Sequence, residues 1–269
     1  MAEYLAIDAE SSGRVSDFLD SPATYHALHI AKTLPEEDPT PPMTVGNAAH
    51  CLILEGREVY GQRYAVGPCD DKRRTAWKAF AEGLPSSLTA LTPSQAEIVE
   101  ACFAAVQLHD EAREALFEWE GVPELSGLWE DDETHLACKL RFDRLCRSHC
   151  APIELKTSKS AHPDAVRRTA ISLAYHRRAA WYTEGYRELY GLTPKSLPFI
   201  TVATEMPASV LEDRVHVWTI DAELEELGHR DNRTALEGIA AARASGVWRA
   251  SWSRGVHTVT APSWMARAI

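Results

Sequence analysis

Long apolar runs are absent from this sequence. No stretch approaches the roughly 18 residues that a membrane-spanning helix needs, and the longest runs are short, such as LPFITVA at 197–203. The first residues, MAEYLAIDAESSGRV, also lack the basic start and apolar segment of a signal peptide. We therefore expect a cytoplasmic protein with no membrane partner.

Positive charge is scarce as well. The chain has 28 Lys+Arg against 39 Asp+Glu, which gives a formal net charge of −11. This balance argues against a broad basic surface that coats nucleic acid. It does not exclude a local basic groove, so nucleic acid stays open as a substrate.

Cysteine is limited to six residues. In a cytoplasmic protein we expect them to be free thiols or small core residues, without a disulfide framework. Cys146, His149 and Cys150 form a C-x2-H-C group that suggests a zinc site. No cysteine follows Cys150, however, so a fourth ligand would have to come from a distant residue. Thiols of a hairpin loop are the better interpretation.

The remaining composition is that of an ordinary globular protein, with 45% hydrophobic residues, 14 Gly and 15 Pro. We find no internal repeat, low-complexity segment or linker. A chain of this length forms one domain or at most two. We expect a single domain over residues 1–269, mainly helical over 1–120 and built around a sheet over 121–269.

Helices are predicted in the first portion from apolar periodicity and cap residues. Ser21-Pro22 is a helix start, and VGNAAHCLILE (45–55) is an apolar helix with one polar insertion, His50. Further helices are expected over 72–84 and 93–118. The segment before residue 45 is expected to be an extended loop because it contains four prolines, Pro35, Pro39, Pro41 and Pro42.

Strands are predicted in the second portion. ELSGLWE, HLACKLRFDRL and PIELKT have strand length and alternation, and the acidic turn at 130–133 is expected to be solvated. A helix over 160–189, the strands SLPFITVATE and RVHVWTI, and a helix over 222–244 follow. The tail is expected to be loop-like with one strand. This order predicts an α+β fold.

Two carboxylates and a lysine are the strongest chemical signal. Glu154 and Lys156 share one face of a strand because side chains alternate. RLCRSHCAPI has the length of a hairpin that returns Asp143 to the side of Glu154. Converging carboxylates bind hard cations such as Mg²⁺ or Mn²⁺, which activate water toward a phosphodiester. An exposed polar strand face is the alternative, but Glu154 lies between apolar neighbours, and Glu124 could add a carboxylate.

A helix after these strands carries Tyr175, Arg178, Tyr182 and Tyr186 on one face. Such an aromatic stripe is more often core, but its arginine suits stacking and phosphate contact. Basic residues are also frequent between 156 and 178. A solvated helix face is the usual explanation, but here we favour a groove that grips phosphate; the residues are Lys156, Lys159, Arg167, Arg168, Arg177 and Arg178.

Four stretches resemble the RecE-like (exonuclease VIII type) phage recombination exonucleases of the PD-(D/E)xK nuclease superfamily. They are GNAAHCLILE, ELSGLWEDDETHLACKLRFDRL, PIELKTS and YHRRAAWYTEGY, and VTAPSWM is similar to the closing segment of that family. The resemblance implies a PD-(D/E)xK restriction-endonuclease-like core, a central mixed sheet flanked by helices, with a helical N-terminal portion. It covers most of the chain.

The resemblance also implies roles for individual residues. Asp143 and Glu154 would be metal-binding carboxylates, His50 a metal ligand or its partner, Glu124 an acid near the scissile phosphate, and Lys156 the catalytic lysine. Tyr182 would line the DNA-facing side, and Arg178, Tyr175 and Lys159 are further candidates for DNA contact. Without the resemblance, His50 would be read as a core histidine.

The activity that the resemblance implies is metal-dependent degradation of linear double-stranded DNA from the 5′ end, giving single-stranded tails for recombination. A ring-shaped homo-oligomer, a single-strand annealing protein as partner and a phage or prophage origin come with it. Arg178 departs from the family pattern, which has glutamine there. The alternative is therefore a catalytically weak or inactive module that binds DNA ends. A third reading is an endonuclease or a single-strand exonuclease on the same core.

Overall fold

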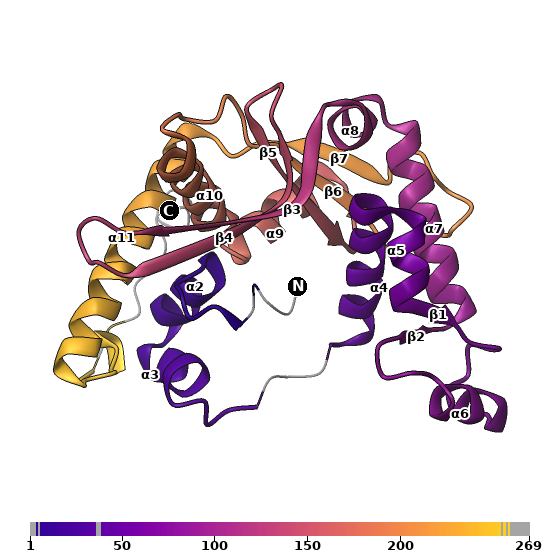
Figure 1. Cartoon of the computed structure of the whole chain (residues 1–269), viewed down its shortest axis with the longest axis horizontal. Helices are drawn as coiled ribbons and strands as arrows, with labels where there is room; N and C mark the ends of the chain where they lie inside the picture. The colour runs from indigo at the N-terminus through magenta and orange to yellow at the C-terminus, as the bar shows by residue number, and fades with distance from the viewer. Residues whose placement is uncertain (1–3, 5, 36–38, 254, 257, 259–269) are drawn as a thin grey trace.

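A five-stranded mixed sheet forms the centre of the protein. We analysed a computed structural model that describes residues 4, 6–35, 39–253, 255, 256 and 258. The strand order is β3 (Gly121–Glu130), β4 (Ala137–Cys146), β5 (Ala151–Ser158), β6 (Phe199–Ala203) and β7 (Val215–Trp218). The β5–β6 pair is parallel and the other three pairs are antiparallel. The predicted mixed α+β architecture is confirmed (Figure 1).

Helices precede the sheet in two groups. The first contains α2 (Ser12–Asp20), α3 (Pro22–Tyr25) and a π-helical turn, η1 (His26–Ile30). The second contains α4 (Pro41–His50), the π-helical turn η2 (Cys51–Glu55), α5 (Gly56–Arg63), α6 (Thr75–Glu82) and α7 (Pro93–Leu108), followed by α8 (Asp110–Arg113) and η3 (Glu114–Glu118). Two short strands, β1 (Tyr64–Val66) and β2 (Thr89–Leu91), pair in parallel beside them.

Helices also follow the central strands. These are α9 (Pro163–Ser172) and α10 (Tyr175–Tyr190) before β6, then α11 (Ala222–Ser245) and a short 3-10 turn, η4 (Ser251–Ser253). Figure 1 shows α2, α3 and α11 at one end of the molecule and α4, α5 and α7 at the other. None of the helices described combines the length and apolar character of a membrane span.

The core has a separate cluster on each side of the sheet. One cluster joins β4 to α10 and α11 through Leu140, Phe142, Trp181 and Ile239. The other packs α4, α7 and η3 against β5 and β6. Burial of these apolar side chains stabilises the fold by about 25 cal/mol per Å². The sheet is therefore held between helices, and the side chains where β4 and β5 diverge lie between the two clusters.

Several predicted boundaries are wrong for identifiable reasons. Pro41 and Pro42 do not belong to an extended loop but form the first turn of α4, where a missing N–H costs nothing. The helix expected over 93–118 ends at Leu108, because His109 has extended backbone angles. The helix expected over 160–189 is broken at Ala174, which has φ of 50°. Most of the tail, with its expected strand and VTAPSWM, lies outside the described residues.

An N-terminal segment is fixed to β4. Glu10 forms a parallel bridge to Cys138, and the Lys139 ammonium group donates to the carbonyl oxygens of Tyr4 and Ile7 at 3.1 and 2.6 Å. Glu10 is buried, and its carboxylate accepts from Tyr25 at 2.8 Å and from Arg243 at 2.6 Å. These contacts connect the beginning of the chain to the sheet and to α11.

Candidate active site

The candidate site begins where β4 and β5 separate. Their ladder covers only three residue pairs and ends with Arg144 opposite Ile153. Beyond it, the Leu155 N–H donates to Asp143 Oδ2 at 2.8 Å instead of to a backbone carbonyl. The hairpin predicted from the sequence therefore brings Asp143 to the side of Glu154.

Glu154 lies at the centre of a charged cluster. Its side chain is 0% exposed, although a buried carboxylate is costly unless it is paired. Lys156 donates to Glu154 Oε1 from the same strand face, as the alternation predicted. Arg178 Nη1 from α10 donates to the same oxygen at 2.8 Å. Glu154 Oε2 is buried without a hydrogen-bond partner among the described residues.

The pKa values of Asp143 and Glu154 are shifted in opposite directions. Burial raises the pKa of Asp143, and the neighbouring charge of Glu154 raises it further. Burial would also raise the pKa of Glu154, but Lys156 and Arg178 outweigh it and hold that pKa well below its usual range. Glu154 therefore stays ionised, whereas Asp143 favours its proton until a positive charge comes close.

A cavity of about 590 Å³ opens beside this pair. It lies between α4 and β3–β5 and is lined by residues that include Asn47, His50, Glu124, Arg141, Asp143 and Lys156. A Cβ atom on Gly46 would lie 2.7 Å from Thr157 Oγ1, so glycine allows α4 to approach β5 this closely. This approach places His50, one turn later, at the cavity.

His50 ends α4 at the start of the π-helical turn η2. Burial lowers the pKa of this imidazole to about 4, and the nearby Lys156 contributes to the decrease. His50 is therefore neutral at neutral pH, which is the form that binds a metal or accepts a proton. The structure places it in the same cavity as Asp143 and Lys156, as expected.

Glu124 reaches the cavity through an unusual backbone conformation. Its φ is 54° in the middle of β3, a left-handed value that costs a non-glycine residue about 1–2 kcal/mol. Such strained residues cluster at functional sites. The carboxylate pairs with Arg141 Nε at 2.8 Å, and burial raises its pKa.

The donor set suits Mg²⁺ or Mn²⁺. These ions prefer oxygen ligands and are often held by one or two carboxylates, with water and substrate phosphates completing the shell. Asp143 supplies one carboxylate, and the unpartnered Oε2 of Glu154 is a second, buried donor. No group of three His, Cys, Asp or Glu side chains among the described residues is arranged to hold a metal ion. The residues present therefore fit a cation that keeps positions for water and phosphate.

A family described as "PDDEXK-like domain of unknown function (DUF3799)" matches residues 11–245. The chain belongs to this family. Its range includes both the helical portion before the sheet and every strand of the sheet, so the predicted PD-(D/E)xK-like core is confirmed.

Solved structures are also similar to this chain. A "Putative exonuclease" from Eubacterium rectale matches with a TM-score of 0.61 and 14% identity, over 97% of this chain and 92% of that one. A "phage related exonuclease" from Haemophilus somnus 129PT matches with a TM-score of 0.37 and 11% identity, over 74% of this chain and 94% of that one. The likeness to the Eubacterium rectale protein shows the fold of this chain. No curated protein matches the sequence.

The residues expected to contact DNA have different positions in this PDDEXK-like domain. Tyr182 is 7% exposed, packs on Phe142 and donates its hydroxyl to the Arg141 carbonyl at 3.1 Å, so it is a core residue and not on an exposed face. Tyr175 stacks with Phe199 and Trp218, and Lys156 lies over its ring.

The basic residues after β5 do not form one continuous groove. Lys159 is 82% exposed and pairs with Glu205 at 3.3 Å. Arg167 pairs with Asp164, and Arg177 pairs with Asp231. Because acidic neighbours pair with Lys159, Arg167 and Arg177, these three residues do not extend the predicted basic groove beyond Lys156 and Arg178.

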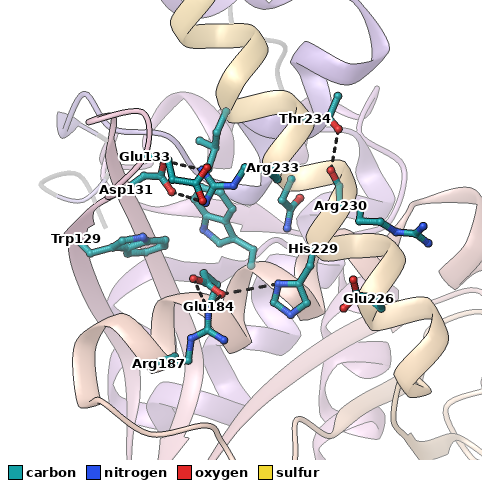
Figure 2. A pocket seen from close by; sticks show the side chains of 13 residues that line it. Trp129, Asp131, Glu133, Glu184, Arg187, Glu226, His229, Arg230, Arg233 and Thr234 are labelled. Carbon is teal, nitrogen blue, oxygen red and sulfur yellow. Dashed lines mark hydrogen bonds and ion pairs between the residues drawn. The ribbon is translucent and has the colours of Figure 1, made fainter.

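A second cavity shows why the acidic turn was misjudged. Asp131 is buried rather than solvated, because Arg233 from α11 donates to both its oxygens, at 2.7 and 2.9 Å. Figure 2 shows this pair beside Glu184, which contacts Arg187 and His229. Most of the charges drawn are paired with one another, and none of the predicted catalytic residues lines this cavity. The cavity between α4 and the strands is therefore the candidate active site.

The cysteine-containing turn carries no metal cluster among the residues described. Cys146 is buried at the end of β4, not in the loop, and its thiol donates to the Ala115 carbonyl at 3.4 Å. His149 stacks on Trp119 with ring centroids 3.9 Å apart. The Cys146 thiol and the His149 ring therefore both have contacts within the protein.

Two contributors to the site were missed in the sequence. Arg141 lies two residues before Asp143, and the period of a strand could have placed it on the same face. Tyr4 lies under Lys139 and Arg141, whose charged groups are 4.9 and 5.4 Å from its ring centre. Nothing local in the sequence indicates that residue 4 returns to β4.

Proposed function

We propose that this PDDEXK-like domain is a nuclease that hydrolyses DNA phosphodiester bonds in the cavity between α4 and β3–β5. The observation that carries this proposal is the convergence of Asp143, Glu154 and Lys156 at the point where two strands separate. Glu154 is held ionised, and Asp143 lines an open cavity. Carboxyl groups with pKa values shifted by burial and by a specific charge partner, next to a cavity, are typical of functional sites.

Each side chain has a distinct task in this proposal. The Lys156 ammonium group offsets the charge that develops on the phosphate and orients the attacking water. Asp143 and Glu154 hold a divalent cation, Mg²⁺ or Mn²⁺. When bound, this ion polarises the phosphodiester and lowers the pKa of the attacking water. The neutral imidazole of His50 is a further ligand or partner of this cation, and Glu124 is the acid that lies near the scissile phosphate; both side chains line the same cavity.

The substrate is proposed to be the end of linear double-stranded DNA, degraded from the 5′ terminus to leave single-stranded tails for recombination. The sequence resemblance to RecE-like exonucleases supports this assignment, and the name "Putative exonuclease" of the Eubacterium rectale protein agrees with an exonuclease. A ring-shaped homo-oligomer and a single-strand annealing partner belong to the same proposal. A ring that surrounds the duplex would help a chain with a net charge of −11 to retain DNA. A protein that sediments as a monomer at working concentration contradicts the ring.

A digestion assay tests the activity. Linear 5′-phosphorylated duplex DNA is incubated with Mg²⁺, Mn²⁺ or EDTA, beside closed circular DNA and the Glu154→Ala variant. We expect metal-dependent loss of the linear DNA alone, and none with the variant. Cleavage of the circle would indicate an endonuclease instead.

The Arg178–Glu154 ion pair favours a second candidate, a module that binds DNA ends without turnover. In this protein a positively charged guanidinium already neutralises the central carboxylate. A folded protein that binds linear DNA in EDTA, and cleaves it with neither metal, would make this the better assignment.

A further inference from the structure

Among the described residues, the cationic side chains at the candidate active site match or exceed its ionised carboxylates without any added ion. The carboxylates of Glu124, Asp143 and Glu154 lie beside the cationic groups of Arg141, Lys156 and Arg178. A divalent cation that enters such a site adds two charges to an arrangement that has no excess of negative charge, even when Asp143 is ionised. One of the cationic side chains must therefore move away, or cation binding is weakened by like-charge repulsion.

Arg178 is the side chain able to move. Lys156 leaves the sheet next to Glu154 and is 15% exposed, whereas the Arg178 side chain is 35% exposed and comes from α10. Arg141 is engaged with Glu124. The long arginine side chain can therefore turn toward solvent without disturbing the strands.

The two oxygens of the Glu154 carboxylate differ in their hydrogen bonds. Both cationic groups donate to Oε1, while Oε2 is buried and has no partner in the described part of the chain. An unpaired buried oxygen is unfavourable. It is the atom that a cation shared with Asp143 would satisfy.

We infer that Arg178 is a built-in competitor of the divalent cation: its guanidinium neutralises Glu154 in the resting protein and leaves when the cation binds. This inference rests on the proposed function and adds regulation of the same site. Once released, the guanidinium is free to bind a DNA phosphate, which it recognises through two parallel hydrogen bonds. By reciprocity, DNA that captures Arg178 strengthens cation binding.

A titration with Mn²⁺, followed by electron paramagnetic resonance in the absence of DNA, tests the competition. Arg178→Gln should bind Mn²⁺ about tenfold more tightly than the natural protein, because one cationic charge beside the ion is removed. Arg178→Lys should stay close to the natural protein. Arg177→Gln is the matched control, since Arg177 belongs to the same helix but pairs with Asp231. Equal or weaker binding by Arg178→Gln overturns the inference.

A second measurement avoids dependence on variants. A crystal structure of the natural protein grown with Mn²⁺ should show the ion at Glu154 and the Arg178 guanidinium beyond hydrogen-bond distance from it. An ion at Glu154 with Arg178 still hydrogen-bonded there overturns the inference. If Arg178→Gln binds no more tightly while the natural protein cleaves DNA, only the inference fails. If no variant binds Mn²⁺ and none cleaves DNA, the proposed function fails with it.

Discussion

Asp143 substitutes for a backbone acceptor of β4: its side-chain oxygen accepts the Leu155 N–H at 2.8 Å where the ladder between β4 and β5 ends. One carboxylate thus closes the sheet and faces the cavity. The strands can diverge here without leaving an unsatisfied backbone donor, which would be costly. The separation of the strands and the position of the acid therefore have the same cause.

Asp143→Asn should separate these two roles. The amide oxygen can still accept the Leu155 N–H, so we expect a folded protein whose DNA cleavage is reduced at least about 100-fold. Because the folded pKa of Asp143 is raised, the natural protein loses stability as the pH rises above the unfolded value near 4. The variant should not show this loss. Urea unfolding at several pH values measures the difference, and identical curves for both proteins would contradict it.

Lys156→Ala should abolish cleavage while DNA binding in EDTA persists, because the lysine stabilises charge at the reacting phosphate. Lys78→Ala is the control, since Lys78 is exposed on α6 and far along the chain from the site. Gel-based digestion rates and binding by fluorescence anisotropy distinguish the two effects. Cleavage by Lys156→Ala at the rate of the control would remove this lysine from the mechanism.

His50→Gln should change how stability depends on pH. The pKa of His50 falls from 6.5 to about 4 on folding, so the unfolded chain binds more protons between these values. The natural protein should therefore be fully stabilised above pH 6.5 and lose about 1–3 kcal/mol from this group as the pH falls to about 4. In the variant that contribution disappears. Parallel slopes for the two proteins would mean that His50 is not neutralised by folding.

Asp131→Ala should destabilise the fold even though the residue belongs to an acidic turn. It leaves the Arg233 guanidinium without its two hydrogen bonds and removes the acceptor of Thr134. We expect a loss of about 2–3 kcal/mol in the free energy of unfolding. Asp132→Ala, one residue later and exposed, should change stability by less than about 0.5 kcal/mol. Equal effects of both variants would contradict the buried pairing.

Local patterns predicted the parts of the site that local geometry determines. Alternation identified β3–β5, and the length of the hairpin predicted that Asp143 meets Glu154. The break at Ala174 was missed because an alanine in the left-handed region has no signature in composition. The partner of Asp131 is 102 residues away, and Arg178 reaches Glu154 only because α10 packs on the sheet. Such ion pairs depend on tertiary structure, and the spacing of residues along the sequence does not predict them.

Lys139 holds Tyr4 and Ile7 in place beside β4. Lys139 is 4% exposed as a residue, and its ammonium group donates to the carbonyl oxygens of Tyr4 and Ile7 in the N-terminal segment. Detaching that segment would leave a bare positive charge inside the protein next to Arg141. The segment therefore cannot serve as a loose arm that swings toward DNA. Shortening the chain by ten residues would be expected to disturb β4 itself, where Lys139 and Asp143 lie.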